Sequence, residues 1–168
     1  MCCLLKLGFK TTTFVAAIVS LVLNVSGLDI FYRWDLSYLT QEPVEWEEST
    51  VNWITVCTYV FLTLGMCASA SAIWGLFKKQ NGQVLAFAIY LILVVILAIL
   101  GFVLCAVSMS VAKRDQEISS EVREEVIDAF AEYGVIFVIS AVVGTLTCLA
   151  SFVTACIIGQ EAQEGHFC

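Results

Sequence analysis

Two cysteines at the start of the chain are the residues best suited to chemistry. Cys2 and Cys3 directly precede the first long apolar stretch. A cysteine beside the membrane on the cytosolic side is a usual acceptor for palmitate. We therefore expect at least one of the two to be acylated. Because the chain has apolar segments long enough to cross a bilayer, the lipid would tune sorting rather than serve as the anchor.

The remaining cysteines do not form a pattern that binds metal or staples loops. Five fall inside apolar stretches and one is the last residue, so a loop-stapling disulfide framework is not expected, although one bridge between Cys57 and Cys105 stays open. None of their spacings is that of a zinc site. Those in the stretches are expected to be small packing residues. The six are Cys57, Cys67, Cys105, Cys148, Cys156 and Cys168.

Groups for acid–base catalysis are absent from the long apolar stretches, which contain no Asp, Glu, Lys, Arg or His. Ionisable residues inside a membrane usually mark ion paths, proton relays or substrate sites. The single histidine, His166, lies near the C-terminus. The sequence therefore predicts no catalytic site, no metal, no cofactor and no enzymatic activity. A pore formed by an oligomer stays open, since carbonyls and hydroxyls can line one.

The elements that carry these residues follow from composition. The chain is 60% hydrophobic and 14% charged, whereas a soluble domain is nearer half apolar and a quarter charged. Four uncharged stretches cover about residues 11–28, 51–77, 84–112 and 135–158. A helix needs roughly 20 apolar residues to span a bilayer. We predict an all-α fold in which residues 1–168 form a single four-helix transmembrane bundle.

The first stretch has an alternative interpretation. Lys6 and Lys10 followed by an apolar run also resemble a signal peptide, and Val25-Ser26-Gly27 is a tolerable cleavage site. Cleavage would leave three spans, and the mass of the mature chain distinguishes the two interpretations. With four spans, both termini lie on one side. The basic residues are densest near the N-terminus and at Lys78 and Lys79, which favours cytosolic termini.

Two segments lie on the side of the membrane opposite the termini, one between the first and second spans and one between the third and fourth. Both are predicted to be acidic outer loops. In the second, about 113–134, Ser119-Ser120 can cap a helix that starts at Glu121. A short amphipathic helix is expected there, leading into the fourth span. Residues 78–83 contain Asn81-Gly82 and are expected to form a tight turn. The first outer loop, about 29–50, owes its acidity mainly to Asp35, Glu42, Glu45, Glu47 and Glu48.

Small residues at helical spacing mark the faces expected to pack against other helices, because they let backbones approach closely. Such packing within one chain and self-association both stay open. Asn24 is the most polar residue in any span and is expected to bond across helices. The small packing residues are Gly65, Ser69 and Ala72 in the second span, and Ser140, Gly144 and Cys148 in the fourth.

The opening Cys2-Cys3-Leu4-Leu5-Lys6-Leu7-Gly8, which runs directly into the first span, resembles the start of lysosome-associated four-transmembrane proteins and their insect relatives. The resemblance covers about 25 residues and the general layout. MARVEL proteins are similar in size and topology. Ligase recruitment through PPxY is not implied, because Pro43 is the single proline. Tetraspanins and claudins need loop cysteines that the predicted loops lack.

We expect a non-enzymatic integral membrane tetraspan that organises, escorts or scaffolds membrane proteins or lipids, by lateral helix packing and acidic extracytosolic loops. The alternatives are a subunit of an oligomeric channel or carrier, and a junction or adhesion protein. The partners would be membrane lipids and another membrane protein or a second copy. Nucleic acid is not expected at a net charge of −7. The expected location is the plasma membrane or the endosomal and lysosomal membranes.

Overall fold

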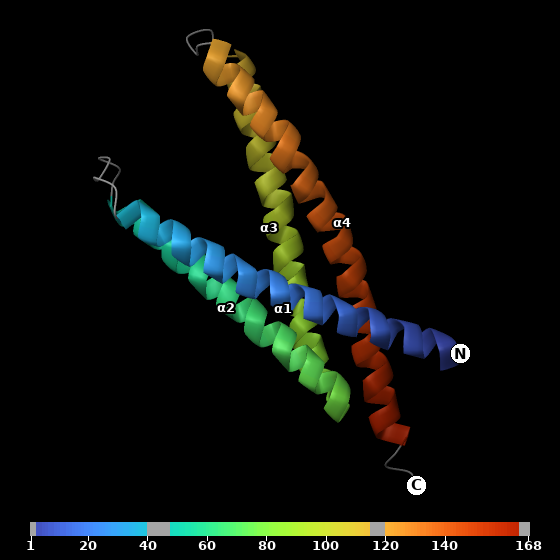
Figure 1. Ribbon diagram of the computed structural model, residues 1–168. Coiled ribbons are helices and arrows are strands. Elements are labelled where there is room, and N and C mark those ends of the chain that lie inside the picture. The colour runs from blue at the N-terminus through green and yellow to red at the C-terminus, as the bar shows by residue number, and fades with distance from the viewer. Residues whose placement is uncertain (1–2, 40–47, 115–119, 165–168) are drawn as a thin grey trace. The chain divides into compact units, whose positions relative to one another are not determined.

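The computed structural model describes residues 3–39, 48–114 and 120–164. These ranges form four helices, α1 (Cys3–Leu39), α2 (Glu48–Lys78), α3 (Asn81–Arg114) and α4 (Ser120–Glu164) (Figure 1). Each helix holds a segment long and apolar enough to cross a membrane, which confirms the all-α fold with four candidate spans. These segments are Leu4–Ile30, Thr55–Lys78, Asn81–Val111 and Tyr133–Gln163.

Both neighbouring helices extend into the first predicted outer loop, about residues 29–50. Helix α1 continues to Leu39, so Asp35 is a helical residue, and Glu48 is the first residue of α2. The reason is local, because residues 29–39 contain neither glycine nor proline to end a helix. Glu42, Glu45 and Glu47 lie outside the described residues.

A separate amphipathic helix is not seen in the second outer segment. Helix α4 begins at Ser120, one residue before the predicted start, and continues without a break to Glu164. The helix predicted to lead into the fourth span is therefore the first part of α4. The side chains of Val122 and Val126 lie outside the described set, so the apolar face expected there stays a prediction.

The turn between α2 and α3 is as tight as predicted and lies within the predicted residues 78–83, but Lys79 and Gln80 form it rather than Asn81-Gly82. Lys79 has a φ of 54°, and the Gln80 N–H donates to the Gly75 carbonyl at 2.8 Å. This pattern closes many helix C-termini, usually with glycine in the left-handed position. Asn81 and Gly82, the predicted turn residues, instead begin α3.

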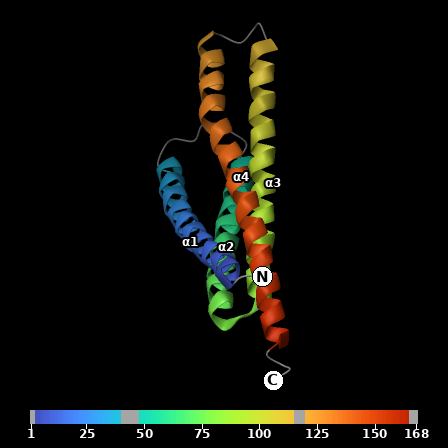
Figure 2. The same cartoon turned by 90° about the vertical axis from the view of Figure 1, so that its right-hand side faces the viewer.

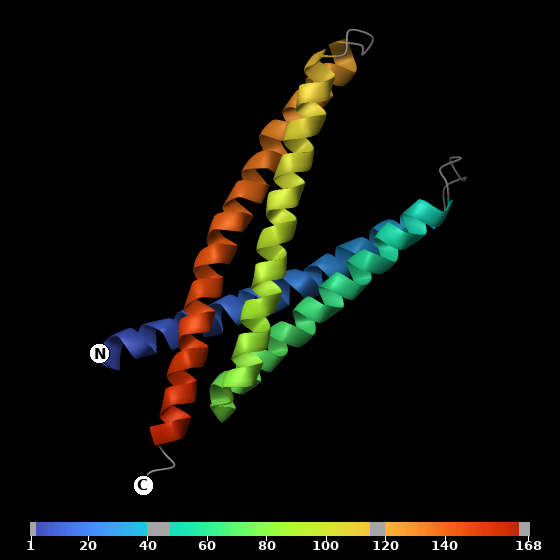
Figure 3. The same ribbon diagram turned by 180° about the vertical axis from the view of Figure 1, so that it is seen from behind.

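The chain divides into two compact units. Unit 1 comprises Met1–Tyr90 and Ala150–Cys168, and unit 2 comprises Leu91–Leu149. In unit 1, α1 and α2 lie side by side (Figure 2). In unit 2, the described parts of α3 and α4 lie side by side (Figure 3). The single domain expected for residues 1–168 stays a prediction.

The core of unit 1 consists of small and polar residues as well as apolar ones. Val84, Ala155 and Ile158 form a buried cluster against Leu76, while the buried polar residues are Thr13, Asn24, Ser69, Ser151 and Thr154. The outward-facing residues of α1 are large and aliphatic, among them Val15, Ile18, Val22 and Leu23. Helices surrounded by lipid pack in this way, because lipid solvates aliphatic side chains and small residues allow close approach.

In unit 2, a glycine of α3 packs against a large side chain of α4, and a glycine of α4 packs against a side chain of α3. A Cβ on Gly101 of α3 would lie 2.7 Å from the Phe137 ring of α4, and one on Gly144 would lie 2.9 Å from Val95. The ring centres of Phe102 and Phe130 are 6.0 Å apart. Close backbone approach at these glycines therefore defines how the two helices pack.

Candidate functional site

One face of α1 carries the polar residues of this helix that bond to other helices. Lys10, Thr13, Ala17, Ser20 and Asn24 follow one another at steps of three, four, three and four residues. This spacing places them along one line of a helix. Thr13 and Ala17 are fully buried and Asn24 is nearly so. We call these five residues the α1 inner face.

Asn24 links α1 to α3. The Tyr90 hydroxyl donates to Asn24 Oδ1 at 3.1 Å. Asn24 Nδ2 in turn donates to the Ser20 carbonyl at 2.7 Å and lies 3.2 Å from Ser20 Oγ. Tyr90 is buried, and its ring packs 5.5 Å from that of Phe61 on α2. The expectation that Asn24 bonds across helices is confirmed.

Ser20 extends this arrangement to α2. Ser69 Oγ lies 3.0 Å from Ser20 Oγ and 2.7 Å from the Gly65 carbonyl. Because a serine hydroxyl has one hydrogen, Ser69 donates to only one of these oxygens. If Ser69 donates to the Gly65 carbonyl and Ser20 donates to Ser69, both hydroxyls are satisfied.

Gly65 is the position where α2 gives these side chains room. A Cβ there would lie 2.6 Å from Asn24 Cγ and would also meet Asn24 Oδ1 and the Tyr90 hydroxyl. Gly65, Ser69 and Ala72 are all buried. The structure thus places the three packing residues of α2 in contact with elements of the same chain.

Two further contacts join α1 to α4. The Thr13 and Thr154 hydroxyls are 2.9 Å apart and buried. Thr154 also donates to the Ala150 carbonyl at 2.8 Å, so Thr13 supplies the hydrogen between the two threonines. Nearer the helix ends, Lys10 Nζ donates to both carboxylate oxygens of Glu161 at 2.8 and 2.9 Å. The α1 inner face therefore contacts each of the other three helices.

The other predicted site residues lie elsewhere. Gly144 is buried in unit 2, where Ser140 and Cys148 are half-buried. Cys3 is the first residue of α1, whereas Cys2 lies outside the described residues. None of Cys57, Cys67, Cys105, Cys148 and Cys156 takes part in a disulfide.

Most of the polar contacts were missed in the sequence. Thr13, Ser20, Thr154 and Tyr90 were not predicted as site residues, because none of them is charged at neutral pH and a hydroxyl alone does not mark a site. The signal that would have found the first two is the seven-residue periodicity of polar and small residues through Lys10 and Asn24. No such periodicity identifies Tyr90, since it lies on α3 and not on this face of α1.

The polar groups of this arrangement form hydrogen bonds that join helices. In mid-span its side chains are neutral hydroxyls and an amide that bond to one another or to backbone carbonyls. Within the described parts of the chain, no three His, Cys, Asp or Glu residues lie close enough to hold a metal ion. The α1 inner face is thus suited to fixing the order and register of helices.

A double-mutant cycle tests the link between α1 and α3. Asn24→Ala and Tyr90→Phe are each expected to destabilise the protein, with a coupling energy of about 0.6 kcal/mol, the average for such bonds between membrane helices, and at most about 1.7 kcal/mol. Unfolding in mixed detergent micelles measures it. Thr63→Val is the control, because the exposed Thr63 hydroxyl bonds only to the Tyr59 carbonyl of its own helix. Additive effects of the two variants would contradict the link.

No protein-family model, no curated protein and no solved structure matches the chain. The resemblance to lysosome-associated four-transmembrane proteins therefore stays a prediction.

Proposed function

We propose that the protein is a non-enzymatic tetraspan that organises or escorts membrane proteins or lipids by lateral contact within the bilayer. The observation that carries this proposal is the α1 inner face, which directs polar groups inward and leaves aliphatic side chains outward. The mid-span hydroxyls and amide bond to one another or to backbone carbonyls, which holds helices together, and this set contains no base that would activate a hydroxyl for attack on a substrate. What remains for function is the outer surface.

The glycines of the small-residue faces already pack against other helices of the same chain. We therefore expect a partner protein to contact other residues. Gly65 lies against Asn24 and Tyr90, and Gly144 lies against Val95. A second helix therefore has no close approach to these glycines without displacing their present neighbours. A partner would instead contact the large aliphatic side chains of α1 or α4, such as Val22 and Leu146, which are more than half exposed.

The proposal includes α1 as part of the mature protein. Cleavage near Gly27 would remove Thr13, Ser20 and Asn24. Thr154, Ser69 and Tyr90 would then lose their partners on α1 in an environment without water to replace them. Cytosolic termini also belong to the proposal, as does acylation at Cys2 or Cys3, which would tune the sorting of the protein between membranes.

Site-specific photo-crosslinking in native membranes tests the lateral role. A photoreactive residue placed at Val22 or Leu146 should give discrete adducts with neighbouring proteins. The same residue at Ala72, which is fully buried, is the control and should react only within the chain. If Val22 and Leu146 yield no reproducible protein adduct, the role as an organiser of membrane proteins is wrong.

A further inference from the structure

Four lysines gather at helix ends within unit 1. Lys6 and Lys10 lie in the first turns of α1, Lys78 ends α2, and Lys79 follows it in the turn. We call these four residues the basic end. Among side chains that the structure describes, the acid in this group is Glu161, which is paired with Lys10 at 2.8 Å.

Three of the four lysines lie near one carboxylate. Lys6, Lys10 and Lys79 all act electrostatically on the Glu161 carboxylate, although they come from α1 and from the turn after α2. Glu161 neutralises Lys10 by direct contact. Lys6, Lys78 and Lys79 form no ion pair with any residue whose side chain is described. The basic end therefore has a surplus of positive charge.

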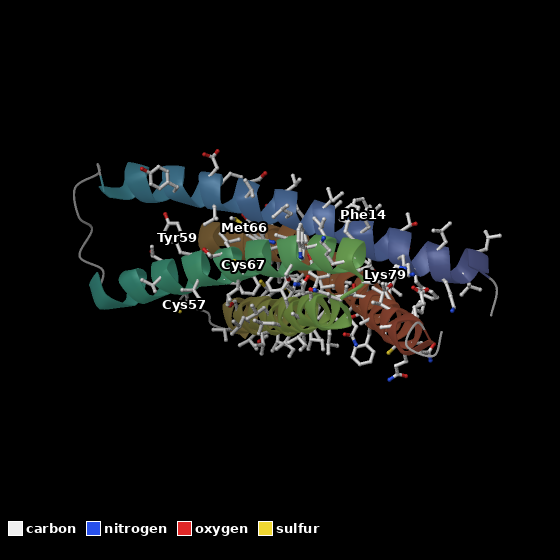
Figure 4. The ribbon with its side chains drawn as sticks, turned by 90° about the horizontal axis from the view of Figure 1, so that it is seen from below. Phe14, Cys57, Tyr59, Met66, Cys67 and Lys79 are labelled. Carbon is white, nitrogen blue, oxygen red and sulfur yellow. The ribbon has the colours of Figure 1, made fainter. Side chains whose placement is uncertain are left out.

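The start of α3 increases this surplus. Asn81 directly follows the Lys79–Gln80 turn, and the first turn of α3 contains no acidic residue. The first N–H groups of a helix have no partner within it, and the helix dipole makes this end positive. Lys78 at the end of α2 and Lys79, which is labelled in Figure 4, therefore stand beside a further source of positive potential.

Aromatic neighbours indicate the depth at which the basic end lies. Lys78 Nζ lies 5.2 Å from the centre of the Trp74 ring. Trp74 and Phe77 are more than half exposed, as is Leu7 on α1. Tryptophan beside lysine at the end of a spanning helix is typical of the interface between hydrocarbon and headgroups. By this criterion the end of α2, with Lys78, is expected at the depth of the lipid phosphates.

We propose that the basic end binds the headgroups of anionic phospholipids in the leaflet where α2 ends and α3 begins. Several lysines at headgroup depth with exposed apolar anchors match a lipid, which offers a phosphate and acyl chains together. An acidic protein segment would match the charge but not the exposed apolar side chains. The inference goes beyond the proposed lateral role, and it holds even if no protein partner exists.

Native mass spectrometry of the full chain in mild detergent, titrated with phosphatidylserine or phosphatidylcholine, tests the proposal. We expect tighter binding of phosphatidylserine, weakening as salt rises. Lys78→Gln with Lys79→Gln should reduce phosphatidylserine affinity by roughly five- to 25-fold, since each lysine near an anionic surface contributes up to about fivefold. Glu161→Gln should raise it by up to about fivefold, because it releases Lys10 and removes a like charge.

The matched control is Lys113→Gln with Arg114→Gln, which makes the same charge change in unit 2. It should leave most of the phosphatidylserine affinity intact. Equal binding of the two lipids, an unchanged affinity in the Lys78 and Lys79 variant, or an equal loss in the control would each overturn the proposal. Circular dichroism verifies that every variant keeps its helices before lipids are compared.

Discussion

Replacing Gly65 with valine is expected to lower the free energy of unfolding by about 2–3 kcal/mol, the cost of overpacking a tight site together with loss of a hydrogen bond between membrane helices. The added carbons would meet Asn24 and the Tyr90 hydroxyl. Asn24 is short and bonded to Ser20, while Tyr90 is buried beside Phe61. Neither side chain has room to withdraw, so α1, α2 and α3 must separate locally.

Thermal denaturation in detergent, followed by size-exclusion chromatography, measures this loss. Gly82→Ala is a suitable control, because a Cβ there meets no atom within 4 Å, and its midpoint should stay close to that of the natural sequence. Gly65→Ala should fall between the two. A Gly65→Val protein as stable as the natural one would mean that Asn24 and Tyr90 do not meet over Gly65.

The four spans could be predicted because lipid imposes one simple requirement. Residues in hydrocarbon must be apolar over a full helical crossing, and hydropathy reports that directly. The ends of the helices do not follow from the same rule. Nothing in the bilayer requires α1 to stop at Leu28, so it continues through Asp35 until Leu39. Asn81-Gly82 is a common turn sequence, but these two residues begin α3.

The α1 inner face was only partly predictable for a different reason. Asn24 was noticed because an amide is rare in a span. The hydroxyls of Thr13 and Ser20 change hydropathy little, and serine or threonine in a membrane helix often bonds only to its own backbone. Thr63 does this in α2, whereas Thr13 bonds to Thr154. Composition does not separate these cases, since the difference lies in which helix is the neighbour.

Replacing Gly101 with alanine is the corresponding test for unit 2. A Cβ there would lie 2.7 and 2.8 Å from two atoms of the Phe137 ring, so α3 and α4 must move apart or the ring must leave its position. We expect a loss of about 1–3 kcal/mol, as for other overpacked sites. Gly134→Ala is the control from the same unit, because its Cβ would meet the Phe130 ring at an ordinary 3.7 Å.

A second substitution identifies the cause of the loss at Gly101. Phe137→Leu alone removes ring contacts and should also destabilise, but together with Gly101→Ala it relieves the clash. The stability lost by the double variant should therefore be roughly 1 kcal/mol smaller than the sum of the losses of the two single variants, a coupling typical of residues in contact. Additive losses in thermal denaturation would show that Phe137 does not lie over Gly101. The same variants can be used in the photo-crosslinking experiment to test each unit on its own. Gly101→Ala should change the adducts from Leu146 in unit 2, and Gly65→Val should change the adducts from Val22 in unit 1.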